Sequence, residues 1–400
     1  MTQPLLPVEA ALERLLALAE AAPIEQTEQV ALGDAEGRVL ATDLIGSLDL
    51  PPWPNSAMDG YAVRLADLHA QPLIVSQRIF AGHAPAPLQP GTCARIFTGA
   101  PMPAGADCVE MQENTEVLDD GRVRFLQPLR VDQNVRPQGQ ETRKGETVML
   151  RGTRLGPIEL GLAATLGHAY LPVVRRVRVA VLSTGDELVE PGLALGPGQI
   201  YNSNRRLLVS WLQRLGCEVR DMGILPDDLP RTRECLAGLG DVDLILSTGG
   251  VSVGEADYLG AALREAGELA LWKLAIKPGK PLTFGHYQNV PVIGLPGNPA
   301  STLVTFGLLT RPYLLRRQGV TEVAPLRFEV PAAFAWNKAG SRREYLRARL
   351  DNGQAHIYKN QSSGVLRSAA WAHGLVEVLE GSTPQIGDKV WFIPLSELLG

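Results

Sequence analysis

Between Arg178 and Arg317 the sequence alternates short apolar runs with amphipathic stretches, and this alternation constrains the fold more than any other feature. The runs that predict strands are VRVAVLS, CEVRDMGIL, DLILS, LALWKLAI and VPVIGL. The stretches that predict helices are YNSNRRLLVSWLQRLG, PRTRECLAGLG, ADYLGAALREAG and ASTLVTFGLLTRPYLLRR. Strands that alternate with helices are typical of a mostly parallel sheet with helices on both faces. We therefore expect a doubly wound α/β domain over residues 178–326.

The rest of the chain follows other patterns. Val8, Leu12, Leu15, Leu16 and Ala19 recur at helical spacing, which predicts an amphipathic helix. Short alternating runs separated by Pro and Gly predict a β-rich domain over residues 49–145. It is inserted into a discontinuous domain of helical and extended segments, residues 5–48 and 146–177, where GPIELGLAATLG predicts a second helix. Residues 327–400 return to short strands, which predict a small β-barrel.

Composition narrows the possible functions. The net charge of −5, with basic and acidic residues intermixed, argues against nucleic acid or an anionic membrane as a partner. RRVR at residues 175–178 is interpreted as a solvated strand edge. No apolar run is long enough to span a membrane, and acids within the first apolar pattern argue against a signal peptide. The cysteines lack CxxC spacing, so we expect reduced, buried thiols in a cytoplasmic protein: Cys93, Cys108, Cys217 and Cys235.

Loops that follow the predicted strands carry the candidate binding residues. Ligands of open α/β sheets bind beyond the carboxyl ends of the strands, where these loops meet. The loops read STGDE, STGGVSVGEAD and LPGNP, and each alone is more often ordinary turn chemistry. Their convergence favours a phosphate site, in which Asn298 is expected to cap a helix that starts at Pro299. The predicted binding residues are Ser183, Thr184, Gly185, Ser247, Gly249, Gly250, Ser252, Pro296, Gly297, Asn298 and Pro299.

Cations and acids accompany these loops. WKLAIKPGKP contains Lys273, Lys277 and Lys280, which form either a solvated hairpin or, as we favour because the prolines stiffen it, a site for phosphate or another oxyanion. The acids in the post-strand loops are Asp186, Glu187, Asp227, Asp228, Glu255 and Asp257. Carboxylates beside a phosphate site require a cation, and Mg²⁺ is the usual one. Asp228 can alternatively have only a structural role, because a negative charge is favourable at the N-terminus of a helix.

PPWPNSAMDGYAV, residues 51–63, holds a single acid, Asp59, in a stretch stiffened by proline. Its prolines exclude a helix and a central strand, so the stretch is a loop. On its residues alone, a joint between two elements is the more ordinary interpretation, and a functional site is the alternative.

Six motifs in order, SAMDGYA, IFTGAPMPAGAD, STGDEL, STGGVSVGEADY, WKLAIKPGKP and GLPGNPAS, resemble the molybdopterin molybdenumtransferase family, which is related to the C-terminal domain of gephyrin. The resemblance covers nearly the whole chain. It implies an enzyme that takes adenylylated molybdopterin and molybdate as substrates, inserts the metal with Mg²⁺-dependent cleavage of the phosphoanhydride, and releases AMP.

The resemblance also implies roles for individual residues. Those implied in catalysis are Asp59, Thr98, Glu187, Lys273 and Lys277, and those implied in binding Mg²⁺ are Asp227, Asp228, Asp257 and Glu187. Lys280, Pro296 and Pro299 are implied in substrate binding. RPQGQET departs from the family pattern, because Gln140 stands where an acid is usual and only Glu141 keeps a carboxylate.

By the same resemblance, the chain is expected to form a homodimer in which Asp59 and Thr98 complete the partner subunit's site. The implied protein partners are the molybdopterin adenylyltransferase and the enzymes that accept the cofactor. Two other functions stay open: adenylyltransferase-type activity, which SAMDGYA argues against, and a gephyrin-like scaffold, which would not need the lysine and carboxylate loops.

Overall fold

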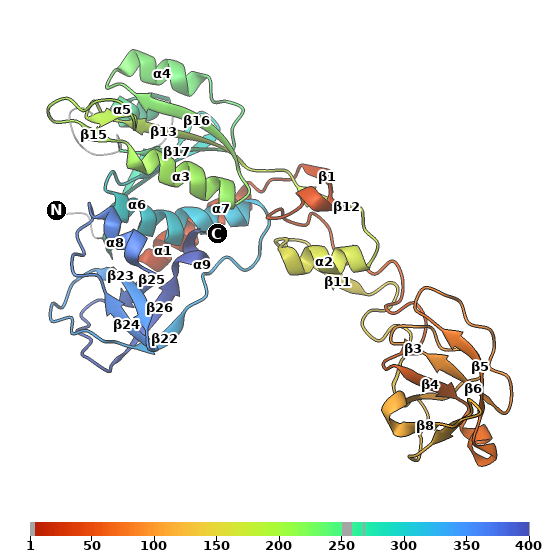
Figure 1. Ribbon diagram of the computed structural model, residues 1–400. Coiled ribbons are helices and arrows are strands. Elements are labelled where there is room, and N and C mark those ends of the chain that lie inside the picture. Colours follow the sequence, from red (N-terminus) through yellow and green to blue (C-terminus); the bar gives the residue numbers. More distant parts are fainter. Residues whose placement is uncertain (1–4, 250–257, 267–268, 400) are drawn as a thin grey trace. The chain divides into compact units, whose positions relative to one another are not determined.

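The segment with the alternating pattern forms an open α/β sheet, as predicted (Figure 1). The computed structural model describes residues 5–249, 258–266 and 269–399. The sheet has six strands in the order β16, β13, β17, β21, β20, β18. The first four are parallel to one another, and β20 pairs antiparallel with both β21 and β18. The strands are β13 (Arg178–Thr184), β16 (Glu218–Leu225), β17 (Leu244–Thr248), β18 (Leu269–Lys273), β20 (Pro281–Tyr287) and β21 (Val290–Leu295). The helices are α3 (Ser203–Arg214), α4 (Leu229–Ala237) and α5 (Tyr258–Ala266), and a short pair, β14 (Leu188–Val189) and β15 (Ile200–Tyr201), lies beside them.

Both faces of this sheet are covered, because successive side chains of a strand point to opposite faces. Val181 of β13 packs in one core with Leu208 of α3. Leu182, the next residue, packs in a second core with Leu263 of α5. Each fully buried aliphatic side chain contributes about 1.5–3 kcal/mol to the stability of the fold. The alternating side chains of β13 therefore stabilise the packing of helices on both faces of the sheet. The doubly wound fold class is therefore confirmed.

Two strands differ from the prediction. The run PLTFGHY forms β20, which the sequence analysis did not predict as a strand. LALWKLAI was expected as one strand, but it divides into β18 and β19 (Ile276–Lys277). The N–H of Leu274 donates to the carbonyl of Lys280 at 2.7 Å, which turns the chain, and β19 then pairs with a strand of another sheet.

The predicted last helix of the α/β domain is continuous but irregular. It comprises α6 (Pro299–Thr305), a π-helical turn (Phe306–Thr310) and α7 (Arg311–Arg317). Pro312 has no N–H to donate, and its ring would crowd the carbonyl four residues earlier in a regular helix. The wider π-helical turn immediately before it relieves that conflict.

The N-terminal helix and the C-terminal strands pack around the same core. α1 (Val8–Ala21) buries Val8, Leu15 and Ala19, as its spacing predicts, in one cluster with Leu314 of α7. The C-terminal sheet has the order β19, β23, β25, β26, β22, with β24 beside β23. Its elements are β22 (Phe328–Pro331), β23 (Arg343–Asp351), β24 (Gln354–Ile357), α8 (Leu366–Trp371), β25 (Gly374–Val378), β26 (Lys389–Pro394) and α9 (Leu395–Leu399). Among the described helices, none combines the length and apolar character needed to cross a bilayer.

The chain divides into two compact units. The first comprises Met1–Ala41, Arg151–Gly156 and Tyr170–Gly400, and the second comprises Thr42–Leu150 and Pro157–Ala169. The predicted four-domain division is finer than this and stays a prediction. In the first unit β1 (Thr27–Ala31) pairs with β12 (Tyr170–Val174).

The second unit is β-rich, and its main sheet has the order β5, β6, β4, β7. Tyr61, Val63 and Cys93 pack in a cluster on one side of this sheet, and Ala62, Ile79 and Ile96 in another. Its elements are β2 (Leu44–Ile45), β3 (Asn55–Ser56), β4 (Gly60–Val63), β5 (Ile74–Ile79), β6 (Thr92–Ile96), β7 (Cys108–Met111), β8 (Thr115–Val117), β9 (Val123–Phe125), β10 (Val135–Arg136), β11 (Thr147–Met149) and α2 (Pro157–Thr165). The helix predicted from GPIELGLAATLG is confirmed as α2.

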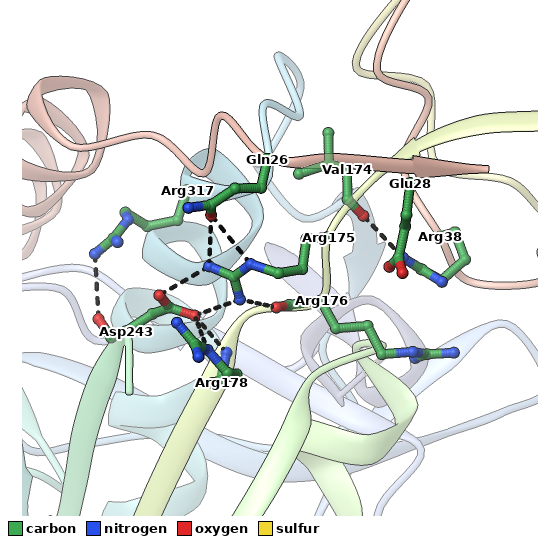
Figure 2. A network of polar contacts seen from close by, with 9 residues as sticks. All are labelled: Gln26, Glu28, Arg38, Val174, Arg175, Arg176, Arg178, Asp243 and Arg317. Carbon is green, nitrogen blue, oxygen red and sulfur yellow. Dashed lines mark hydrogen bonds and ion pairs between the residues drawn. The ribbon is translucent and has the colours of Figure 1, made fainter. Parts of the chain in front are cut away.

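A polar network joins five segments of the first unit (Figure 2). The guanidinium of Arg175, just after β12, donates to both carboxylate oxygens of Asp243 at 2.9 and 3.0 Å and to Gln26 Oε1. The backbone N–H of Arg178, at the start of β13, donates to Asp243 at 2.7 Å. Arg317, at the end of α7, donates to the carbonyl of Asp243 at 3.3 Å. Asp243 and Arg175 therefore link the start of β13, the segment before β1 and the end of α7.

This network corrects the interpretation of RRVR as a solvated edge. The side chains of Arg175 and Asp243 are largely buried and bonded to each other at two points. Burial raises the pKa of Asp243, but the hydrogen bonds and positive charges of Arg175 and Arg178 outweigh that effect and leave the pKa below its ordinary value.

We expect Asp243→Asn to lower the free energy of unfolding by about 2–4 kcal/mol at neutral pH, because it leaves Arg175 without a charged partner. A carboxylate with a lowered pKa stabilises the fold above its unfolded pKa and loses this effect as the pH falls through the folded value. The difference in the free energy of unfolding between the wild type and Asp243→Asn should therefore shrink below about pH 4. Urea unfolding at several pH values measures it. Asp241→Asn, at an exposed pair with Arg220, is the control and should change little.

Candidate active site

The loops after β13, β17 and β21 meet at one pocket, as the sheet topology predicts. The pocket has a volume of about 520 Å³ and contains residues from all three loops, including Thr184, Gly249 and Asn298. Its full lining is Thr184, Glu187, Leu188, Ile200, Tyr201, Asn202, Ser203, Asn204, Thr248, Gly249, Gly297, Asn298, Pro299 and Gly364. We call it the sheet-edge pocket. Of the other predicted binding residues, Ser183 lies buried just before it, with its hydroxyl 3.3 Å from that of Thr248.

Two glycines of these loops have conformations that other residues rarely adopt. Gly185 has φ +137°, and a Cβ there would collide with the carboxylate of Glu187. Gly249 has φ +79°, and a Cβ there would lie 3.0 Å from the carbonyl oxygen of Thr184. The small residues therefore let the backbone of two neighbouring loops approach closely.

Several buried polar atoms of the sheet-edge pocket have no hydrogen-bond partner in the described part of the chain. They are Thr184 Oγ1, Asn202 Nδ2 and Asn204 Oδ1. Asn204 also donates from Nδ2 to the carbonyl of Gly297 at 2.6 Å, which orients its side chain. Buried polar atoms are usually hydrogen-bonded, so an unpaired group of three suits a polar ligand. The sequence analysis did not identify Asn204; its place in YNSN, directly after β15, was the only signal.

Asn298 differs from its expected role. It stands at the N-cap position of α6, but its side chain makes no capping hydrogen bond. Its carbonyl instead accepts the N–H of Thr302 at 2.9 Å, and the Thr302 hydroxyl donates to Pro296 O at 2.6 Å. The Asn298 side chain lines the pocket and is available to a ligand there.

Some of the acids of the post-strand loops lie close together: Asp186, Glu187 and Asp227. The N–H of Asp227 donates to Asp186 Oδ1 at 3.2 Å. Burial raises the pKa of Asp227, a hydrogen bond from the backbone of Asp186 opposes this rise, and the negative charges of Asp186 and Glu187 add to it. Asp228 instead caps α4, because its Oδ1 accepts the N–H of Arg231 at 2.8 Å.

Among the described residues, no group of three or more acidic, His or Cys side chains is arranged to hold a metal ion. The predicted residues Gly250, Ser252 and Asp257 lie outside the described residues. Mg²⁺ commonly takes only one or two carboxylates and fills its remaining positions with water and phosphate oxygens. The cluster around Asp227 therefore suits Mg²⁺, and the predicted metal set stays a prediction.

The predicted lysines lie near the C-terminal sheet. Lys273 ends β18 and Lys280 precedes β20, and both are exposed. The ammonium of Lys277 forms an ion pair with Glu344 of β23 at 3.0 Å. It lines a second pocket of about 300 Å³, which we call the arginine pocket: Lys277, Pro278, Glu344, Tyr345, Leu346, Arg347, Gln361 and Ser362.

Arg347 is a candidate site residue that the sequence analysis missed. It is fully buried, and its guanidinium donates to the hydroxyl of Ser368 and the carbonyl of Ser362, both at 3.0 Å. These partners are neutral, and burial lowers the Arg347 pKa to about 10. A buried guanidinium with neutral partners favours an anion nearby. The only signal in the sequence was a charged residue on the inward side of the run EYLRARL.

The two pockets share one segment of the chain. Ser362 lines the arginine pocket, and Gly364, two residues later, lines the sheet-edge pocket. The carbonyl of Ser363 accepts the N–H of Ala300 at the start of α6. Residues 362–364 therefore contribute to the walls of both pockets.

Asp59 and Thr98 lie in the second unit and contact each other. Asp59 Oδ1 accepts both the backbone N–H and the hydroxyl of Thr98, each at 2.7 Å. These hydrogen bonds lower the pKa of Asp59, and the positive charge of Arg95 adds a smaller effect. Gly60 cannot be replaced there without a collision with the carbonyl of Glu110. The carboxylate is thus ionised, exposed and fixed in orientation.

Arg95 fixes this turn from the neighbouring strand. Its guanidinium donates to the carbonyl of Gly60 at 2.9 Å, contacts the side chain of Gln112, and lies 4.7 Å from the ring centre of Phe97. The N–H of Gln112 donates to the backbone oxygen of Asp59 at 3.1 Å. The interpretation of Asp59 as part of a simple joint does not explain why its carboxylate is held this way.

We expect Thr98→Val to raise the pKa of Asp59 toward its ordinary value, because the variant removes the hydroxyl donor and keeps the N–H. Titration of the carboxyl carbon by NMR measures this pKa. Thr92→Val, at the start of the strand that precedes Thr98, removes a hydroxyl that bonds Ser76 and Gln89 and is the control. An Asp59 pKa equal to that of the wild type would show that the hydroxyl does not stabilise the carboxylate.

Comparison with protein families assigns most of the chain. Residues 6–167 match a family described as "MoeA N-terminal region (domain I and II)". Residues 180–316 match "Probable molybdopterin binding domain", and residues 329–395 match "MoeA C-terminal region (domain IV)". The sheet-edge pocket lies largely within the second of these matches.

Similar proteins give the same result over the full length. The molybdopterin molybdenumtransferase of Haemophilus influenzae is 40% identical over 385 residues, 94% of this chain and 95% of the relative. The enzyme of the same name from Nostoc sp. is 37% identical over 377 residues, 90% of this chain and 86% of the relative. The crystal structure of the molybdopterin biosynthesis moeA protein from Pyrococcus horikoshii OT3 is 29% identical, covers 98% of this chain and 100% of its own, and has a TM-score of 0.83.

Proposed function

Because the chain belongs to the molybdopterin molybdenumtransferase family and is a transferase of molybdenum cofactor biosynthesis, we propose that it inserts molybdate into adenylylated molybdopterin, with Mg²⁺-dependent cleavage of the phosphoanhydride and release of AMP. The observation that supports this reaction is a pair of pockets that share the segment 362–364: one is lined by unpaired neutral polar atoms, and the other contains Lys277 and Arg347. A substrate with a phosphoanhydride and a separate oxyanion needs both.

The arginine pocket is proposed to take molybdate. Lys277 and Arg347 both line this pocket; Glu344 orients the ammonium of Lys277, and the side chain of Arg347 is buried in the wall. A charge-assisted hydrogen bond from a buried guanidinium is about twice as strong as one between neutral groups. Lys273 and Lys280 are proposed to contact the phosphates.

The sheet-edge pocket is proposed to take the phosphoanhydride end of the substrate. Thr184, Asn202 and Asn204 offer their unpaired polar atoms to it. Gly249 and Gly297 allow close approach to the backbone. Asn298 supplies a side-chain amide, which makes no capping hydrogen bond to α6.

Asp227 and Glu187 are proposed to hold Mg²⁺ at this pocket, with Asp257 as a further ligand. Bound Mg²⁺ would offset the charge of the anhydride oxygens as AMP leaves. Asp228 is less suited, because its carboxylate already caps α4.

Asp59 and Thr98 are proposed to complete the site of a second subunit in a homodimer. Their support is an exposed, oriented carboxylate that forms no ion pair with the described residues of its own unit. The proposed compartment is the cytoplasm, and the proposed partners are the molybdopterin adenylyltransferase and the enzymes that accept the cofactor.

We expect AMP release from adenylylated molybdopterin to require molybdate, and Lys277→Gln to raise the molybdate concentration for half-maximal rate by about tenfold, which corresponds to one charge-assisted hydrogen bond. Quantifying AMP against molybdate concentration tests both statements. Lys389→Gln, which also removes a lysine paired with a glutamate, is the control. AMP release that ignores molybdate would contradict the proposal, and adenylyl transfer from ATP to molybdopterin would favour the adenylyltransferase alternative.

We expect Asp227→Asn to weaken Mg²⁺ binding and to raise the Mg²⁺ concentration needed for AMP release. The substitution also removes the repulsion among the acids, so thermal stability without Mg²⁺ should stay equal or rise. Calorimetric titration with Mg²⁺ measures the affinity directly. Asp241→Asn is again the control, and equal Mg²⁺ affinity in both variants would exclude Asp227 as a ligand.

A further inference from the structure

An aromatic pocket in the second unit has no role in the function proposed so far. It has a volume of about 460 Å³, within the range of small-molecule sites. Its lining is Trp53, Gly82, His83, Ala84, Pro85, Gly99 and Pro101. We call it the tryptophan pocket. Its lining contains no Lys, Arg, Asp or Glu, so it does not suit a phosphate.

Trp53 is unusually exposed for its type. Its side chain is 53% exposed, and it belongs to neither of the two clusters that form the core of this unit around Tyr61 and Ile79. Phe80, whose ring centre lies 6.5 Å from that of the lining residue His83, is 49% exposed. Exposed aromatic side chains around a concavity indicate a surface that binds something flat and apolar on its faces.

The walls of the tryptophan pocket are already in place. The Trp53 loop is tied to the turn after Thr98, because Met102 donates to Pro54 O, Ser56 donates to Ala100 O and Gly99 donates to Ser56 O, at 2.8–2.9 Å. Next to the lining residue His83, Phe80 stacks on Phe97 with ring centres 4.6 Å apart and planes 8° apart. A site that needs no rearrangement binds with a smaller entropic cost.

The tryptophan pocket adjoins the carboxylate site of the same unit. Gly99 follows Thr98, whose N–H and hydroxyl hold Asp59, and Gly99 lines the pocket. A ligand in the pocket therefore lies next to the turn at Thr98, which holds the proposed catalytic acid, Asp59.

We propose that the tryptophan pocket binds a planar nitrogen heterocycle of the substrate, which stacks on the indole of Trp53. The inference rests on the proposed function, because adenylylated molybdopterin carries two such rings, the pterin and the adenine. Backbone carbonyls and the imidazole of His83 at the pocket offer hydrogen-bond partners for ring N–H groups. A second protein chain that covers the aromatic side chains is the alternative occupant.

The test titrates the full-length protein with neopterin, a free pterin, and separately with AMP, by calorimetry. One of the two probes should bind the wild type, and Trp53→Ala should weaken that binding by about tenfold or more, the effect of losing one ring stack. Trp53→Phe keeps a flat ring and should stay within about threefold of the wild type. Tyr170→Ala removes an exposed aromatic residue far from this pocket in sequence and should leave both affinities unchanged.

The probe that loses affinity identifies the ring. Equal affinity of wild type and Trp53→Ala for both probes would overturn the inference, as would failure of both probes to bind the wild type. A loss of the dimer in Trp53→Ala with unchanged probe affinity would assign the surface to a protein interface and also overturn it. Molybdate-dependent AMP release by the wild type is measured in parallel, so that failure of the proposed reaction is seen separately from failure of ring binding.

Discussion

The carboxylate of Asp243 is the contact on which the arrangement of the first unit depends. It accepts hydrogen bonds from the guanidinium of Arg175, after β12, and from the backbone N–H of Arg178, at the start of β13, while the backbone carbonyl of Asp243 accepts from Arg317 at the end of α7 (Figure 2). Arg175 in turn donates to Gln26, in the segment before β1. Since β13 and β17 are central strands, their register sets where the loops beyond them meet. The sheet-edge pocket lies at the opposite ends of these strands. The polar network around Asp243 and the pocket are therefore connected through two rigid strands.

Charge explains why the candidate site is divided. A phosphoanhydride and molybdate are both anionic, and placing both against lysines alone would leave the polar part of the substrate without specific partners. The proposed function separates the tasks: Lys277 and Arg347 line one pocket, while Thr184, Asn202 and Asn204 offer neutral polar atoms in the other. The acids around Asp227 repel one another, which favours a bound cation between them and the substrate.

Much of the fold could be predicted, because periodicity records which face of an element is buried. β13, β16, β17 and β21 and helices α1 to α5 lie where their patterns place them. β20 could not be predicted, since PLTFGHY begins at a proline and becomes a strand only by pairing with β21 and β18. RRVR appeared solvated, because the acid that pairs with it is far away in sequence.

The same limit applies to the site. The sequence by itself determined the residue types in each loop and, through the parallel alternation, that three of the loops share one edge. It could not show that Asn298 leaves its cap position unused, that Asp228 fills one, or that Arg347 is buried beside Lys277. Local patterns depend on contacts within a few residues, whereas these partners come together only when separate elements pack, and the tertiary structure alone decides that.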